Sequence, residues 1–258
     1  MVLADFPIIG NYIKRVSNNI EKFGLQESIK NEFRKSGTKI EIIGLDSNLL
    51  DILTNKPVVL ISNHPYELEP TVVIASLPKR EDFYFVINSV YLNIFSSLDK
   101  YLIPVFIRHK FVYKILSIDS WLLKFIDKFN PTPVYPPDIE HQKNIEAIKL
   151  ASEKIKAEGM VYITPARYQN VPGWHKGIGY LIKELGPAEN IYYIKTYVQN
   201  SSTLDILRLL PLIGHILPTL KIYFGKPQKL SEIYDENPKR LTTKLENQYN
   251  SWINTLLL

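Results

Sequence analysis

The segment Val58–Pro70, VVLISNHPYELEP, contains a histidine and an acid whose spacing suits acid–base chemistry. Glu69 follows His64 at an offset that lets the intervening loop fold back, so that the carboxylate meets the imidazole. An ionised carboxylate fixes the imidazole tautomer and stabilises the imidazolium that forms during proton transfer. His64 could then deprotonate an alcohol that attacks an acyl ester or thioester, which is worth roughly 100- to 10,000-fold in rate. The alternative is a core histidine bonded to a backbone carbonyl, and this chemistry alone leaves both interpretations open.

Two local elements are expected to position this pair. Val58–Ser62 is a continuous apolar run, which is typical of a strand buried on both faces. Pro70 suits the first position of a helix that runs to about Leu77. Glu69 would then lie at a helix N-terminus, where free amide groups favour an ionised carboxylate.

The remaining pattern alternates strands with helices, which predicts an α/β fold with a mixed, mostly parallel central sheet flanked by helices. We expect an N-terminal helical segment over 1–38 and an α/β domain over 39–258. Expected strands are Lys39–Ile43, Asp82–Ile87, Ile103–Ile107, Met160–Thr164, Ile191–Val198 and Leu220–Phe224. Expected helices are Tyr12–Lys35 with a division at Gly24, Leu49–Leu53, Val112–Phe129, Glu140–Glu158, Trp174–Leu185 and a last one from Asn237.

Two segments that follow strands carry unusual chemistry, Asn63–Glu69 and Pro165–Gly179. Ligands of open α/β sheets bind beyond the carboxyl ends of the strands. We therefore expect the site where these two segments meet. The proline-rich stretch Asn130–Asp138, NPTPVYPPD, is expected to be an extended loop.

The sequence VVLISNHPYELEPTVVIASL resembles the first block of the glycerolipid acyltransferase family, the glycerol-3-phosphate and lysophosphatidate acyltransferases. In that block a strand ends in Asn-His, and an aspartate follows after four residues. Asn63, His64, Glu69 and Pro70 fall on these positions, with glutamate in place of aspartate. The later segments IPVFIR, MVYITPARYQNVPGWHKGIGYLI and LKIYFGKP resemble later blocks, so the resemblance extends to about Pro227.

The resemblance implies an O-acyltransferase in which His64 is the general base and Glu69 orients it. Acyl-CoA or acyl carrier protein would donate the chain, with no metal and no other cofactor. The acceptor would be glycerol 3-phosphate or a lysophospholipid such as lysophosphatidate. Implied substrate-binding residues are Asn63, Arg108, Pro165, Arg167, Lys176 and Gly177.

Arginine suits the phosphate role because its planar fork donates two hydrogen bonds to one phosphate. Lys176 and Gly177 begin an expected helix, whose first amides can bind an anion. Each cation has an alternative role as a surface charge. The family's Pro-Glu-Gly-x-Arg is replaced by Pro165-Ala166-Arg167, which leaves open another acceptor, a non-catalytic lipid- or phosphate-binding relative, or a hydrolase that uses the same histidine.

Composition narrows the alternatives. The chain has no cysteine, which excludes disulfides, thiolate metal sites and a cysteine nucleophile. A net charge of +5 favours anionic partners, but no dense basic block supports nucleic-acid binding. The apolar stretch Leu204–Leu220 is interrupted by charges and prolines and makes a poor membrane span. We expect a cytoplasmic protein, with peripheral membrane contact left open.

Overall fold

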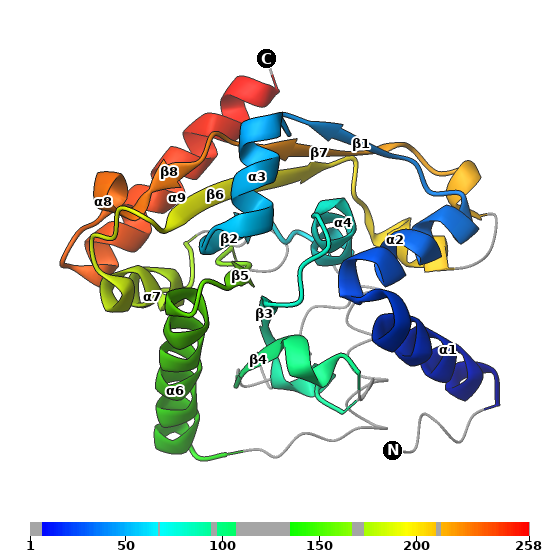
Figure 1. The fold of residues 1–258 in the computed structure, drawn as a ribbon, viewed down its shortest axis with the longest axis horizontal. Coiled ribbons are helices and arrows are strands. Elements are labelled where there is room, and N and C mark those ends of the chain that lie inside the picture. The colour runs from blue at the N-terminus through cyan, green and yellow to red at the C-terminus, as the bar shows by residue number, and fades with distance from the viewer. Residues whose placement is uncertain are drawn as a thin grey trace.

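The central feature of the fold is a mixed β-sheet between two layers of helices (Figure 1). The computed structural model describes residues 7–66, 68–93, 97–106, 135–166, 173–209 and 213–257. The described residues form an eight-stranded sheet in the order β1-β7-β6-β2-β5-β3-β4, and β8 pairs separately with β6. Its strands are β1 (Ile40–Ile43), β2 (Val58–Ser62), β3 (Phe83–Asn88), β4 (Leu102–Val105), β5 (Met160–Ile163), β6 (Tyr192–Gln199), β7 (Leu220–Phe224) and β8 (Gln228–Lys229).

The strand directions confirm the predicted α/β class with a mostly parallel sheet. Strands β6, β2, β5, β3 and β4 are parallel neighbours, so their carboxyl ends lie at one edge of the sheet. Strand β7 pairs antiparallel with β6, and β1 is parallel to β7. The strand that carries the candidate histidine, β2, lies between β5 and β6, in the middle of the sheet.

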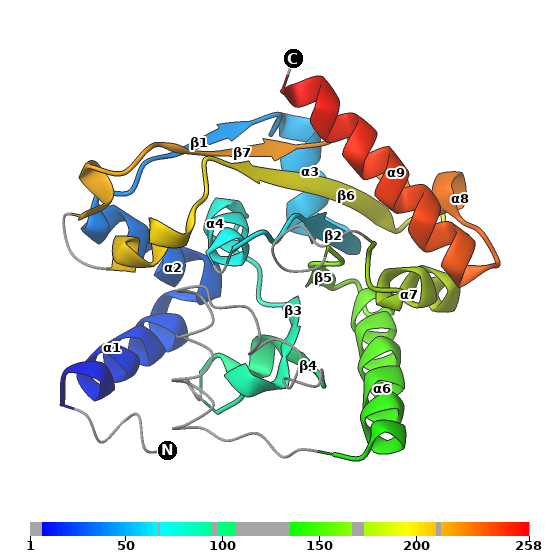
Figure 2. The ribbon, with the colours of Figure 1, turned by 180° about the vertical axis from the view of Figure 1, so that it is seen from behind.

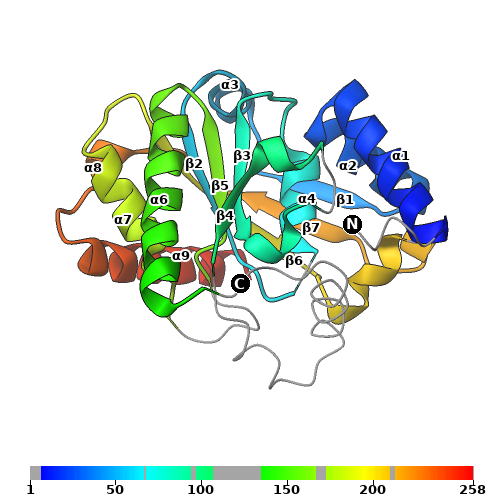
Figure 3. The same cartoon turned by 90° about the horizontal axis from the view of Figure 1, so that it is seen from below.

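Helices cover both faces of the sheet (Figures 1 and 2). One face packs against α1 (Pro7–Phe23), α2 (Leu25–Ser36), α3 (Ser47–Asn55) and α4 (Glu69–Ser76). The other packs against α6 (Pro137–Lys156), α7 (Gly177–Leu185), α8 (Leu230–Ile233) and α9 (Pro238–Leu256). Figure 3 shows α6 and α7 on one side of the strands and α1, α2 and α4 on the other. None of the described helices is long and apolar enough to cross a membrane.

Strand β2 is buried along its whole length because both faces are covered. Val58 and Leu60 belong to the core on the α4 side, and Val59 and Ile61 to the core on the α9 side. Each such side chain contributes about 1.5–3 kcal/mol when fully buried. This burial fixes the position of the residues that follow the strand.

The N-terminal helices α1 and α2 are separated at Gly24, whose φ of 86° suits glycine. Leu25 and Phe33 of α2 are buried in the same core as α4. The predicted division at Gly24 is thereby confirmed, and both helices form part of the layer over the α4 side of the sheet.

Several predicted boundaries change in the structure. Helix α6 begins at Pro137, so the loop prediction was wrong for Pro137 and Asp138, because proline is well tolerated in the first helical turn. Helix α7 begins at Gly177 rather than Trp174. The short elements β8 and α8 were not predicted. The predicted helix Val112–Phe129 lies outside the described residues.

Candidate active site

The turn after β2 sends successive side chains to opposite sides of the sheet. Side chains alternate along a strand. Ser62 therefore follows Leu60 toward the α4 side, where its hydroxyl meets that of Tyr162 on β5. The next residue, Asn63, lies toward α9, and His64 turns back toward Glu69 at the start of α4.

The structure brings His64 and Glu69 together. Nδ1 of His64 lies 3.6 Å from Oε2 of Glu69, and the side chains are 23% and 0% exposed respectively. The same Oε2 accepts a hydrogen bond of 3.1 Å from the backbone amide of Tyr66. Glu69 is the first residue of α4, at the helix end whose backbone amides have no partner within the helix. The buried carboxylate is thus aimed at one imidazole nitrogen of a partly exposed histidine.

The pair is loosely bonded. The separation of 3.6 Å exceeds that of a normal hydrogen bond. The second carboxylate oxygen, Oε1 of Glu69, is buried and has no hydrogen-bond partner in the described part of the chain. Catalytic hydrogen bonds are often long in free enzymes and tighten when substrate binds. The geometry therefore suits a carboxylate that orients the imidazole once a reactant is in place.

Every polar group of Asn63 forms a hydrogen bond within the protein. Its side-chain amide donates to the carbonyl of Val198 and accepts from the amide of the same residue, at 3.0 and 2.9 Å. Its backbone carbonyl accepts a hydrogen bond of 2.8 Å from the Ser62 hydroxyl, and its backbone amide donates one to the Tyr249 hydroxyl. The predicted substrate-binding residue thus joins the end of β2 to β6 and α9, and each polar atom of its side chain already has a partner.

Tyr162 on β5 is hydrogen-bonded to Ser62, the last residue of β2 before the turn. The Ser62 hydroxyl has one proton and gives it to the Asn63 carbonyl, so the Tyr162 hydroxyl donates to Ser62. Burial raises the pKa of Tyr162 well above its usual value, and the negative Glu69 acts in the same direction. The phenol therefore stays protonated at any working pH and keeps its donor role.

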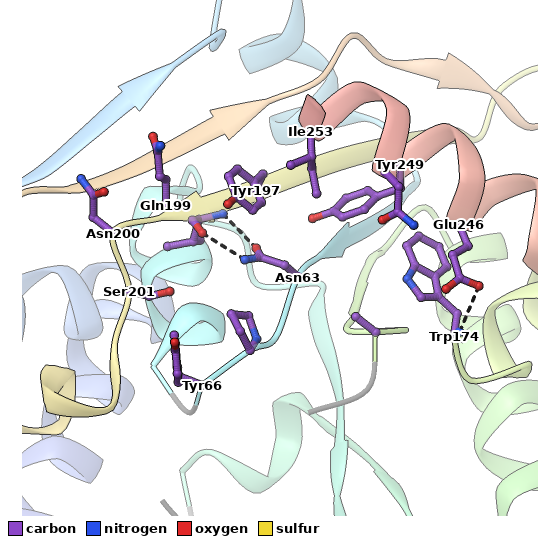
Figure 4. A pocket seen from close by; sticks show the side chains of 14 residues that line it. Asn63, Tyr66, Trp174, Tyr197, Gln199, Asn200, Ser201, Glu246, Tyr249 and Ile253 are labelled. Atoms are coloured by element: carbon purple, nitrogen blue, oxygen red, sulfur yellow. Dashed lines mark hydrogen bonds between the residues drawn. The ribbon is translucent and has the colours of Figure 1, made fainter. Parts of the chain in front are cut away.

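A cavity of about 590 Å³ lies on the other side of this turn, between the carboxyl end of β6 and α9 (Figure 4). Asn63, Pro65 and Tyr66 line it from the turn, and Tyr249 lines it from α9. His64 is not among its described lining residues, because the imidazole is directed to Glu69. We call this space the α9 cavity.

Only some of the residues predicted to bind the substrate lie in the described part of the chain. Pro165 is buried after β5, beside β2, and its carbonyl accepts the His175 amide at 2.9 Å. Lys176 is exposed and occupies the position just before α7 without a side-chain capping bond, and Gly177 is the first helical residue. Arg108 and Arg167 lie outside the described residues. Of the predicted set, the structure thus describes the turn of Asn63 and the segments of Pro165 and Lys176.

Tyr162, Tyr249 and Val198 were missed by sequence reasoning. Each meets the turn from a distant part of the chain, and no local motif marks it. Within the described ranges, no group of three or more His, Asp or Glu side chains could hold a metal ion.

Comparison with known proteins gives limited information. No protein-family model matches the chain, and no curated protein matches it significantly. Among solved structures, the chain is similar to the 1-acyl-sn-glycerophosphate (LPA) acyltransferase PlsC from Thermotoga maritima. The TM-score is 0.49 and the sequence identity 12%, over 96% of this chain and 88% of that chain. The chemistry assigned to this protein therefore rests on its own residues and their geometry.

Proposed function

We propose that this protein is an O-acyltransferase in which His64 is the general base and Glu69 positions it. The observation that carries the proposal is the fully buried Glu69 carboxylate 3.6 Å from Nδ1 of a partly exposed histidine. A carboxylate beside Nδ1 holds the proton on that nitrogen, which leaves Nε2 able to accept a proton. Asn63, the residue before the histidine, is hydrogen-bonded to Val198 through both polar atoms of its side chain, which supports a fixed backbone position at the start of the turn.

The reaction follows from this arrangement. Nε2 of His64 takes the proton of an alcohol, and the alcohol oxygen attacks the carbonyl carbon of an acyl thioester. The carbon–sulfur bond then breaks, and the imidazolium returns its proton to the leaving thiolate. The products are an ester and a free thiol. Glu69 stabilises the transient imidazolium, and general-base catalysis of this kind contributes about 10²- to 10⁴-fold.

The substrates are proposals from sequence resemblance. Acyl-CoA or acyl carrier protein would donate the acyl chain, and no cofactor is required. The acceptor would be an alcohol such as glycerol 3-phosphate or a lysophospholipid, with its phosphate near Arg108, Arg167 and Lys176. A cytoplasmic location with peripheral contact to the membrane that contains the product fits this chemistry.

The test is acyl transfer from long-chain acyl-CoA and acyl carrier protein to a panel of alcohols. We expect kcat of His64→Ala to fall about 10²- to 10⁴-fold below wild type. His141→Ala is the matched control, because His141 is exposed on α6. Equal turnover by wild type and His64→Ala would refute the assignment. Release of free fatty acid without ester would instead identify a hydrolase.

A further inference from the structure

The α9 cavity has an unusual lining for a protein expected to bind phosphate. Among its described lining residues, Glu246 is the one charged group, and no lysine or arginine accompanies it. The others are amide, hydroxyl, aromatic and aliphatic side chains contributed by the β2 turn, the end of β6, the segment before α7, and α9 (Figure 4). A phosphate placed here would face a carboxylate with no nearby cation from this set to offset the repulsion.

Part of this lining is already committed to the protein's own structure. Both carboxylate oxygens of Glu246 accept backbone amides, from Gly173 at 3.1 Å and Trp174 at 3.2 Å. The amide of Asn63 is bonded to β6, and the Tyr249 hydroxyl donates to the carbonyl of Thr196 at 2.7 Å. These bonds make the inner wall of the cavity rigid before any ligand arrives.

A second part of the lining is available. The side-chain oxygen of Gln199 accepts a hydrogen bond of 2.9 Å from the Tyr223 hydroxyl. The side-chain nitrogen of Gln199 forms no hydrogen bond with the described residues. The Asn250 side chain and the hydroxyls of Tyr66 and Tyr197 likewise form no hydrogen bond there. Amides and hydroxyls both donate and accept, which is the pattern that matches an alcohol group.

We propose that the α9 cavity binds the uncharged, hydroxyl-rich part of the acyl acceptor, a glycosyl or polyol group. Several hydroxyls of one ligand would pair with the available amides and phenols, while the aromatic rings pack on its carbon faces. The cavity volume of about 590 Å³ lies within the range of small-molecule sites. A site built for hydroxyl groups strongly rejects analogues that lack them, because its polar groups are then left unpaired.

The cavity and the catalytic pair share one turn. Asn63 and Pro65 line the cavity on either side of His64 in the sequence, while the imidazole faces Glu69. A ligand held in the cavity therefore contacts Asn63 and Pro65, the residues on either side of the base, and its reacting hydroxyl would have to extend around the turn to His64. Binding energy from the remote hydroxyls would then orient the reacting one. That the bound ligand accepts an acyl group rests on the proposed function, whereas its binding in the cavity does not.

Binding is tested apart from catalysis by isothermal titration calorimetry of wild type and His64→Ala. The probes are octyl glucoside, free glucose, myo-inositol and glycerol 3-phosphate, with the glucoside kept below its micellar concentration. We expect hydroxyl-rich probes to bind both proteins alike and more tightly than glycerol 3-phosphate. Binding of octyl glucoside without free glucose or inositol would identify a glycolipid headgroup, and similar binding of all three a free sugar or polyol.

Variants of the lining make the proposal specific. Asn250 is exposed on α9, so Asn250→Ala should fold normally and weaken glucoside binding about 3- to 10-fold, the effect of one or two neutral hydrogen bonds. Asn55→Ala, an exposed amide on α3, is the control and should change nothing.

The outcomes separate the two proposals. Glucoside binding that weakens in Asn250→Ala supports the cavity assignment even if no acyl transfer is found, in which case only the proposed function fails. No binding of any uncharged probe, or equal binding by wild type and Asn250→Ala, would overturn it. Tighter binding of glycerol 3-phosphate than of every uncharged probe in wild type would also overturn it. With acyl-CoA present, Asn250→Ala should lower kcat/KM for the glucoside and leave that for lysophosphatidate unchanged.

Discussion

Asn63 and His64 are neighbours at the end of β2, and the protein uses their polar groups in opposite ways. On the α9 side, all four polar groups of Asn63 have partners within the chain. On the α4 side, His64 lies 3.6 Å from Glu69, and Oε1 of that buried carboxylate has no hydrogen-bond partner among the described residues. Asn63 is fixed by its bonds, whereas His64 faces a buried carboxylate of which one oxygen has no partner in the described part of the chain.

This difference indicates a structural role for Asn63 and agrees with the chemical role proposed for His64 and Glu69. Buried polar groups are nearly always satisfied, and exceptions in native proteins often mark functional sites. Asn63 follows the rule and contributes stability. One oxygen of the buried Glu69 carboxylate departs from it, so we expect this group to cost stability, in agreement with the proposed role of its charge. Substitutions on the two sides of the turn should therefore separate activity from stability.

The largest effect is expected from Glu69→Gln, which keeps the shape and removes the charge. We expect kcat to fall about 10²- to 10⁴-fold with little change in the acceptor KM, because the imidazolium loses its partner in the transition state. The melting temperature should stay the same or rise, because a buried carboxylate with incomplete bonding is removed. Steady-state kinetics and thermal unfolding on the same preparation check both. Parallel losses of activity and stability would assign Glu69 to structure.

Asn63→Ala should produce the opposite result, a large loss of stability. It leaves the buried amide and carbonyl of Val198 without partners, at about 1–3 kcal/mol each, so the free energy of unfolding should fall by about 2–6 kcal/mol. Urea denaturation measures this change. Asn55→Ala removes an exposed amide bond to Asp51 and should cost less than about 0.5 kcal/mol. Similar losses in both variants would contradict the structural role of Asn63.

The smallest effect on stability is expected from Tyr162→Phe, which removes the hydroxyl that donates to Ser62 at the end of β2. The free energy of unfolding should fall by about 1 kcal/mol, the net value of one hydrogen bond. Tyr193→Phe is the matched control, since its hydroxyl is buried with no partner in the described structure and its loss should be neutral or stabilising. If the two variants are equally stable, the bond between Tyr162 and Ser62 contributes nothing.

Much of the local structure could be predicted from the sequence. The apolar run Val58–Ser62 gave β2 with both bounds correct, and Pro70 marked the helix that begins one residue earlier at Glu69. Asn237 was expected at the start of the last helix, and it caps α9. These features depend on short windows of sequence, in which burial and capping preferences act on neighbouring residues.

The sequence by itself therefore determined that a histidine follows a buried strand and that an acid opens the next helix, because backbone geometry couples residues so close in the chain. Only the tertiary structure decided what holds this turn. Val198 reaches Asn63 because β6 lies beside β2, and Tyr249 reaches it because α9 packs on that face. Sheet order and helix packing depend on the burial of surfaces from distant segments, which no local pattern encodes. The same packing placed Glu246 and Asn250 of α9 at the cavity.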